Sequence, residues 1–458
     1  MSIPLQYAND HQQAHLGELM DFLRFPSVST LAARNSDTAA TANWLAQAMT
    51  NAGLENVQVI PTKRHPLVYA DWLHAGVEAP TVLIYGHYDV QPAEPLELWE
   101  TPPFEPTIRD DYLYARGASD DKGQVYIHVK AVEAYLRTIG RLPVNVKFIV
   151  EGEEEIGSRN LHEFIPANRE LLAADSALVS DTAMLGPGKP ALVYGLRGNC
   201  HVILDLIGPA RDLHSGTYGG GVNNPLNALG HLLAHLKDER GHIMIPGFYD
   251  RVRPLTLEER ELLAHFPLDE AAWLRETGAP ELWGEPEYSL VERISARPTL
   301  DVTGMYGGYI GEGTKTVLPS RAHAKISMRL VPDQDPAEIL QLFERFVRSV
   351  LPPSITLNIL HSGGGKAALV DRDTAPMRAA AAAYEAAYQR PPVFMREGGS
   401  IPVVNQFETD LQLPTVLMGF GLPGDHIHSP NERFYVPNFY KGIETSIHYL
   451  DLLSNGSK

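Results

Sequence analysis

Residues 81–89 read TVLIYGHYD, an apolar run that leads directly into His87 and Asp89. A short apolar run bounded by turn residues is typical of a buried strand. Acidic residues or histidines also follow three similar runs, VNVKFIV, SALVS and LPTVLMGFG. Ligands of open α/β sheets bind beyond the carboxyl ends of the strands. The sequence therefore predicts one site at the edge of a sheet.

Segments with helical periodicity alternate with these apolar runs in the first part of the chain. Helices are expected at 38–53, where Gly53 is placed to end the helix, and at 124–139 and 160–174. The alternation of strands and helices predicts an α/β sheet with helices packed on it.

The pattern changes at 194–206, which reads as one strand, and two strand–helix–strand passes follow. Residues 240–300, inside the first of these passes, are irregular and rich in Pro, Glu and Trp. The two passes predict a smaller α+β domain inserted into the first. We expect a discontinuous first domain, residues 1–194 plus 372–458, and an inserted domain, residues 195–371.

The composition excludes several classes of function. The chain has 458 residues, 44% of them hydrophobic and 21% charged, which is typical of a soluble globular protein, and its formal charge is −18. An acidic chain repels phosphate backbones and anionic lipids, so neither nucleic acid nor a membrane is expected as a partner. One cysteine, Cys200, excludes an intramolecular disulfide. With no signal peptide and no long apolar run evident, we expect a cytoplasmic protein.

Five segments together indicate metal binding, although each has an ordinary explanation. Asp120 in ARGASDDKG could cap a helix, and three consecutive glutamates could be a solvated helix start. Carboxylates gathered at one sheet edge repel one another, however, and divalent cations would resolve that repulsion. Imidazole mixed with carboxylate suits zinc, manganese or cobalt better than calcium or magnesium.

The blocks that carry these residues also occur in the order found in one enzyme family. GHYDVQP, ARGASDDKG, EGEEEIGS, VSDTAMLG, YGLRG, DLHSGTYGG, REGGSIP and HIHSPNE resemble the M20 metallopeptidases, and most of all their nonspecific dipeptidase and carnosine dipeptidase branch. The resemblance implies a discontinuous zinc-peptidase-like catalytic domain with an inserted ferredoxin-like lid and dimerisation domain. It also implies two divalent ions per subunit, Zn²⁺, Mn²⁺ or Co²⁺, bound by His87, Asp120, Glu155, Asp181 and His428.

The resemblance implies the remaining catalytic roles as well. Asp120 would bridge the ions, Asp89 would orient His87, and Glu154 would be the general base. Glu153 is a third candidate within the acidic run, and Glu154 and Glu155 are preferred because the family carries its glutamate pair immediately before IGS. His428 is preferred to His426 because the family's ligand immediately precedes Ser-x-Asn-Glu.

Further residues are implied to bind the substrate. His214 would stabilise the oxyanion from the partner subunit of a homodimer. Arg329, Thr316, Ser400 and Gly399 would contact the substrate, with the guanidinium of Arg329 gripping its carboxylate.

The expected function is metal-dependent hydrolysis of the amide bond of small peptide substrates, namely dipeptides. An N-acyl-amino-acid deacylase, a desuccinylase or a carboxypeptidase of the same family is the alternative. A nucleotide-binding reading of GGGK at 363–366 fails, because Leu360 and Ala367 stand where a phosphate-binding loop needs Gly and Ser or Thr. A non-catalytic binding protein is disfavoured, because every expected ligand and the base are present.

Overall fold

The structure is a computed structural model that describes residues 2–455, except the side chains of 362, 363 and 455. It contains two compact units. Unit 1 consists of Met1–Tyr194, Val370–Met395 and Val403–Lys458, and unit 2 of Gly195–Leu369 and Arg396–Pro402.

The segment TVLIYGHYD forms the centre of the main sheet of unit 1 as strand β3 (Thr81–His87). Its neighbours β6 (Asn145–Glu151) and β7 (Ser176–Val179) are parallel to it, and β17 (Thr415–Leu417) is parallel to β7. The sheet continues through β2 (Leu67–Trp72) to β1 (Glu55–Ile60) on one side and reaches β8 (Ala191–Leu196) on the other. The carboxyl ends of the four parallel strands therefore lie at one edge, as predicted.

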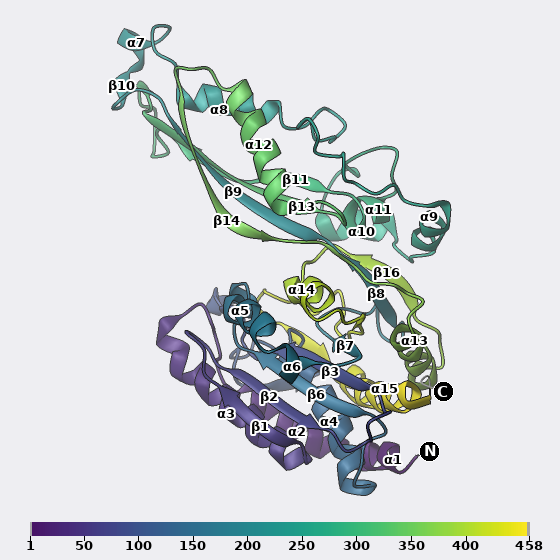
Figure 1. The fold of residues 1–458 in the computed structure, drawn as a ribbon. Helices are drawn as coiled ribbons and strands as arrows, with labels where there is room; N and C mark the ends of the chain where they lie inside the picture. The colour runs from purple at the N-terminus through teal and green to yellow at the C-terminus, as the bar shows by residue number, and fades with distance from the viewer. Residues whose placement is uncertain (1, 456–458) are drawn as a thin grey trace. The chain divides into compact units, whose positions relative to one another are not determined.

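Helices cover both faces of this sheet (Figure 1). One face carries α1 (Ile3–Asp10), α2 (Gln12–Leu23), α3 (Asn35–Ala52), α4 (Lys122–Thr138), α13 (Ala375–Tyr388) and α15 (Val436–Asn455). The other carries α5 (Arg159–Ala167), α6 (Arg169–Leu172) and α14 (Pro402–Asp410), where Phe407 packs on Tyr85 with ring centroids 5.7 Å apart. Gly53, with φ of 97°, ends α3 in the left-handed conformation, as expected.

One buried histidine in unit 1 makes stability depend on pH. His128 in α4 lies between the hydroxyls of Ser180, at 2.7 Å, and Ser446, at 3.0 Å. Burial lowers the pKa of His128 to about 3, so the unfolded chain binds a proton that the folded chain does not. Its contribution to stability is present above pH ~6.5 and is lost as the pH falls. Between pH 7.5 and 5.5 we expect the wild type to lose about 1.4 kcal/mol more than His128→Asn in urea unfolding. Equal losses would contradict this assignment.

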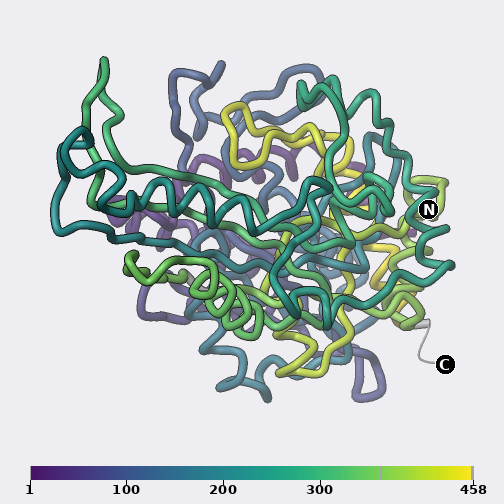
Figure 2. The backbone as a smooth tube through the Cα atoms, turned by 90° about the horizontal axis from the view of Figure 1, so that it is seen from above, coloured from purple at the N-terminus to yellow at the C-terminus, as the bar shows by residue number. Residues whose placement is uncertain are grey.

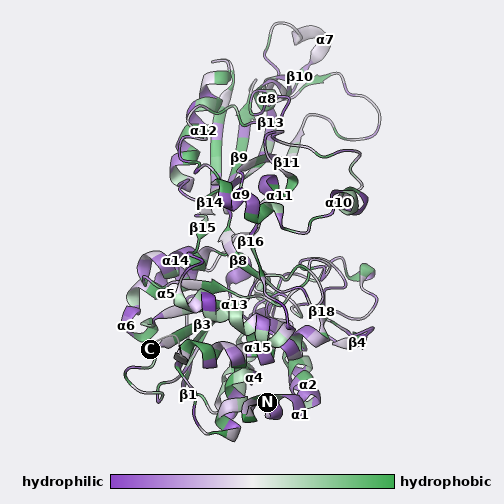
Figure 3. Cartoon of the chain, turned by 90° about the vertical axis from the view of Figure 1, so that its right-hand side faces the viewer, coloured by the Kyte–Doolittle hydropathy of each residue, from purple (hydrophilic) through white to green (hydrophobic). Residues whose placement is uncertain are grey.

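Unit 2 is a four-stranded antiparallel sheet with helices on one face. The chain order is β9 (Gly198–Ile207), α8 (Pro225–Ala234), β11 (Thr299–Gly307), β13 (Arg321–Leu330), α12 (Pro336–Val350) and β14 (Thr356–Gly365). The spatial order is β11-β13-β9-β14, the ferredoxin-like arrangement expected from the family resemblance. The amphipathic helix α12, whose two hydropathic sides are visible in Figure 3, buries Ile339, Phe343 and Val347 against the sheet. The predicted fold class is confirmed.

A short ribbon lies at one end of unit 2. Strand β10 (Leu213–His214) pairs with β12 (Val317–Leu318), and the four-residue helix α7 (Ser215–Tyr218) follows β10. Figure 2 shows these two stretches of chain, far apart in sequence, running beside each other.

Several local predictions were wrong. Residues 194–206 form parts of two strands, β8 and β9, instead of one. Residues 160–174 form α5 and α6, because Pro166 and Asn168 interrupt the helix. The irregular stretch 240–300 contains α9 (Leu257–Ala264), α10 (Glu270–Thr277) and α11 (Leu290–Ser295).

The segment Arg396–Pro402, which we assigned to the first domain, groups with unit 2. The segment groups with unit 2 because its polar side chains contact residues of that unit. Arg396 pairs with Glu259, and the Ser400 hydroxyl donates to the carbonyl of Arg197. The strand β16 (Val393–Glu397) therefore starts in unit 1 and ends in unit 2.

Three further strands, β4 (Thr107–Arg109), β5 (Tyr112–Tyr114) and β18 (Arg433–Tyr435), form a small antiparallel sheet that the sequence patterns did not indicate. Among residues 2–455, none of the helices combines the length and apolarity needed to cross a bilayer.

Candidate metal centre

The strand β3 delivers His87 to the sheet edge in a fully buried position. The residue before it has to be glycine, because a Cβ at Gly86 would lie 2.7 Å from Asp121 Oδ2 and 2.6 Å from Val125 Cγ2. The backbone N–H of His87 donates to the same Asp121 carboxylate, at 3.2 Å. The close approach of β3 to the start of α4 thus places His87 next to the ARGASDDKG loop.

Asp120 in that loop lies between two histidines. Its Oδ1 is 3.0 Å from His87 Nε2, and its Oδ2 is 2.9 Å from His428 Nε2. His428 Nε2 is also 3.2 Å from Glu155 Oε2, and His87 Nε2 is 4.0 Å from Asp181 Oδ2. The structure therefore brings all five predicted ligands together around one carboxylate.

These side chains form two overlapping groups of potential metal ligands. One group contains His87, Asp120 and Asp181, and the other contains Asp120, Glu155 and His428, with ligand atoms within 4.8 Å of one another in each. Asp120 is the member that the groups share. Nitrogen and carboxylate donors in sets of three, joined by one bridging carboxylate, fit two divalent ions of the zinc or manganese kind.

The electrostatics of the site also favour bound cations. Burial, together with the charge of Asp120, raises the pKa of Asp181 well above its usual value and raises that of Glu155. Hydrogen bonds with Asp120 and Glu155 raise the pKa of His428 to about 10. Burial alone would raise the pKa of Asp120, but hydrogen bonds with His428 and His87 lower it. Metal ions would compete with these protons for the same lone pairs, so binding should release protons.

Asp89 connects the histidine to the acidic loop. Its backbone carbonyl is 3.0 Å from His87 Nδ1, and its Oδ1 is 3.4 Å from the same nitrogen. The two carboxylate oxygens accept the backbone N–H groups of Glu154 and Glu155, both at 3.2 Å. One buried carboxylate thus orients the imidazole of His87 so that Nε2 faces the centre, and it holds the loop that carries Glu154 and Glu155.

The hydrogen bonds distinguish the three neighbouring glutamates. Glu153 accepts the N–H of His65 at 2.9 Å and the amide group of Asn160 at 2.6 Å, which fixes it in a structural position. Glu155 accepts from Gln91 at 2.7 Å and faces His428. The Glu154 carboxylate accepts no hydrogen bond from residues 2–455, and burial raises its pKa well above the usual value. Of the three glutamates, Glu154 is therefore the one whose carboxylate accepts no hydrogen bond within the described residues.

The model of Peptidase family M20/M25/M40 matches residues 83–451. The chain belongs to this family. It is 36% identical over 386 residues to the Cys-Gly metallodipeptidase dug1 of Schizosaccharomyces pombe, covering 82% of this chain and 80% of the relative. It is 33% identical over 369 residues to the human Beta-Ala-His dipeptidase, covering 80% and 73%. The predicted dipeptidase branch is thereby confirmed, and the chain is an M20 metallodipeptidase.

A solved structure shares the complete fold. The M20 family metallo-carboxypeptidase Sso-CP2 of Sulfolobus solfataricus matches with a TM-score of 0.88 and 34% identity, over 96% of this chain and 99% of the other. This match extends across both units of the M20 peptidase described here.

Sequence reasoning missed a glutamate that ties two ligand loops of this M20 peptidase together. Glu432 is buried, four residues after His428. Its Oε1 accepts the N–H groups of Ser119 at 3.0 Å and Asp120 at 3.1 Å, and its Oε2 accepts Gly117 N–H and an Arg116 N–H, both at 2.8 Å. The final glutamate of HIHSPNE was the only signal for it.

Replacing Glu432 is expected to damage both stability and metal binding. Glu432→Gln leaves the buried Arg116 without its counterion, a change that costs about 3–5 kcal/mol. Urea unfolding measures that loss, and titration with Zn²⁺ measures the weaker affinity expected once Asp120 is less firmly held. The double variant Arg116→Met/Glu432→Gln should recover part of the stability. A loss below about 1 kcal/mol in the single variant would contradict the role of Glu432 as the counterion of Arg116 that ties the two loops together.

The predicted substrate-binding residues lie in unit 2, in two places. Arg329 donates to the Ser400 hydroxyl at 3.0 Å, and Gly399 accepts the N–H of Arg197 at 3.1 Å. His214 and Thr316 lie in the ribbon at the other end, where the N–H of Ser215 donates to Thr316 at 3.1 Å.

The structure does not bring Thr316 to Arg329 within unit 2. The ribbon joins the sheet at the Arg321 end of β13, and Arg329 lies near the opposite end. Eight residues of strand span about 26 Å. The imidazole of His214 is exposed, and its Nδ1 accepts from Gly216 N–H at 3.0 Å.

Proposed function

We propose that this M20 peptidase hydrolyses the amide bond of dipeptides at a dinuclear metal centre formed by His87, Asp120, Glu155, Asp181 and His428. The position of Asp120, with one oxygen toward each histidine, carries the proposal. The names of the Schizosaccharomyces pombe and human relatives, a Cys-Gly metallodipeptidase and a Beta-Ala-His dipeptidase, support dipeptides as the substrate class.

Two bound divalent ions, Zn²⁺ or Mn²⁺ with Co²⁺ as a further candidate, would polarise the scissile carbonyl and lower the pKa of the attacking water. Glu154 accepts the proton of that water and returns it to the leaving amine. Its carboxylate is half-buried and accepts no hydrogen bond from residues 2–455, and its raised pKa suits a group that must both take and give a proton. Asp89 keeps the His87 imidazole in the tautomer whose Nε2 is free to bind.

A homodimer would complete the site. His214 and Thr316 lie at the end of unit 2 away from Arg329 and Ser400. In a dimer, the ribbon of one subunit supplies His214 to stabilise the oxyanion in the site of its partner. Arg329, Ser400, Gly399 and the partner's Thr316 hold the substrate carboxylate.

A substrate panel with the protein loaded with metal tests the function. We expect dipeptides to be hydrolysed well and N-acetyl or N-succinyl amino acids poorly. A preference for longer peptides that lose one carboxyl-terminal residue would support the second candidate, a carboxypeptidase, which is favoured by the likeness to the Sulfolobus enzyme. Efficient cleavage of N-acyl amino acids alone would contradict the dipeptidase proposal.

A further inference from the structure

Unit 2 contains a cavity of about 370 Å³, and Arg329 is the one lining residue to which the proposed reaction assigns a role. It lies against the polar residues of β11 and β13 and is bordered by α11 and by residues of the irregular stretch, and it is open to solvent on one side. Five cationic side chains line it: Arg197, Lys237, Arg293, Arg297 and Arg329. Only two acidic residues, Glu285 and Asp301, are among its lining residues.

Two of the five cations have carboxylate partners. The Arg297 guanidinium binds Glu285 in a bidentate manner, at 2.6 and 2.9 Å. Lys237 Nζ lies 3.3 Å from Asp301 Oδ1, a pair in which the aspartate is 62% exposed. Because a bidentate pair satisfies both charges, Arg297 and Glu285 contribute little net charge to the cavity.

The other three arginines contact only neutral acceptors within the described part of unit 2. Arg197 Nε donates to the carbonyl of Gly398 at 3.2 Å, and Arg293 Nε donates to that of Glu285 at 2.8 Å. Arg329 donates to the Ser400 hydroxyl. Burial and the neighbouring charge of Arg329 lower the pKa of Arg197 to about 10. Adjacent guanidinium groups repel each other, and an anion between them would relieve that repulsion.

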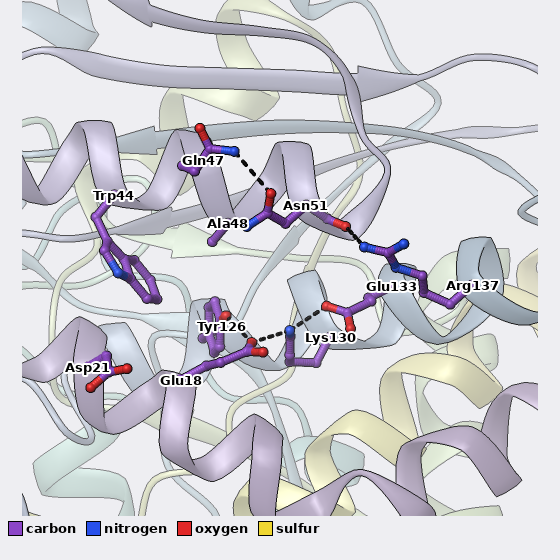
Figure 4. A pocket seen from close by; sticks show the side chains of 10 residues that line it. All are labelled: Glu18, Asp21, Trp44, Gln47, Ala48, Asn51, Tyr126, Lys130, Glu133 and Arg137. Carbon is purple, nitrogen blue, oxygen red and sulfur yellow. Dashed lines mark hydrogen bonds and ion pairs between the residues drawn. The ribbon is translucent and has the colours of Figure 1, made fainter.

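A cavity in unit 1 shows the opposite arrangement. It has a volume of about 420 Å³ and lies between α2, α3 and α4 (Figure 4). There the buried Lys130 ammonium pairs with two carboxylates, those of Glu18 and Glu133. Its charge is already compensated, so it indicates no anionic ligand. Cations outnumber acidic residues by five to two in the unit 2 cavity, whereas three acidic residues and two cations line the unit 1 cavity.

We propose that the unit 2 cavity binds a second carboxylate, beside the one that Arg329 and Ser400 would hold. Its ligand is a small dicarboxylate, either as a dipeptide with an acidic carboxyl-terminal residue or as a free dicarboxylic acid. Arg197 and Arg293 supply the additional charge-assisted hydrogen bonds. The volume lies within the range of small-molecule sites. The dipeptide form of this inference rests on the proposed function, because it shares Arg329 with the substrate site.

The test compares kcat/KM for Ala-Glu and Ala-Gln, two substrates of nearly the same shape that differ in charge. We expect the wild type to prefer Ala-Glu by about tenfold, the size of one charge-assisted hydrogen bond. Arg293→Gln should remove most of that preference, and Arg293→Lys should keep part of it. Because the readout is a ratio, a general loss of activity does not affect it. The matched control Arg240→Gln changes an exposed arginine of the same stretch and should keep the ratio.

Calorimetry with the metal-loaded protein separates the two sources of the dicarboxylate. Glutarate is titrated against its uncharged counterpart, glutaramide. Binding of glutarate that is weakened in Arg293→Gln, without a preference for Ala-Glu, would assign the site to a free dicarboxylate. If neither dipeptide were cleaved but glutarate still bound, the carboxylate site in the cavity would stand and only the proposed function would fail. Equal use of both dipeptides together with no binding of glutarate would overturn the inference.

Discussion

Glu154→Gln is expected to lower kcat for dipeptide hydrolysis by about three to four orders of magnitude, the upper range for loss of a general base. Glutamine keeps the shape of the side chain but cannot take a proton from water. The five proposed ligands are unchanged, so the variant should bind the same amount of metal as the wild type. Steady-state kinetics and elemental analysis of the same preparation check both expectations.

Glu153→Gln provides the matched control, since it changes the neighbouring glutamate. Glu153 is bound by His65 and Asn160, and a glutamine oxygen can still accept the N–H of His65. We expect kcat within about tenfold of the wild type and some loss of stability. If Glu153→Gln were inactive and Glu154→Gln fully active, the general base would have to be reassigned.

Asp120→Asn is expected to remove both metal ions, whereas Asp181→Asn should remove one. Asp120 is the only member common to both groups of ligands, and Asp181 belongs to one of them. A neutral amide is a poor replacement for a bridging carboxylate. Elemental analysis after dialysis against a fixed free metal concentration measures the content of each variant, and activity should be lost in both.

The next residue in the same loop supplies the control for this prediction. Asp121 belongs to neither group of ligands, and its carboxylate accepts the backbone N–H of His87, which an asparagine oxygen can also accept. This variant should retain both ions. Retention of one ion in Asp120→Asn would show that the two sites do not share that carboxylate.

The sequence was sufficient to predict the sheet edge but not all of its details. Strand β3 and helix α12 follow from local patterns, since the apolar run of one and the amphipathic period of the other are undisturbed. The segments of the metal centre were predicted because four of them follow apolar strands and the fifth is the ARGASDDKG loop. Resemblance to the M20 family then assigned a role to each.

Other features depend on contacts that no local pattern encodes. Glu432 meets the N–H groups of the Asp120 loop across more than 300 positions of sequence. The choice among Glu153, Glu154 and Glu155 rests on which of them the fold engages in hydrogen bonds. The short segment Arg396–Pro402 groups with unit 2 because of the polar partners of Arg396 and Ser400, which only the folded chain brings together.

The central claim is that Asp120 bridges two ions, and anomalous diffraction from crystals grown with Zn²⁺ tests it most directly. We expect two anomalous peaks in each subunit, one on either side of the Asp120 carboxylate, next to His87 and to His428 respectively. A single peak away from Asp120 would contradict the account. So would a preparation that still cleaves dipeptides after exhaustive chelation.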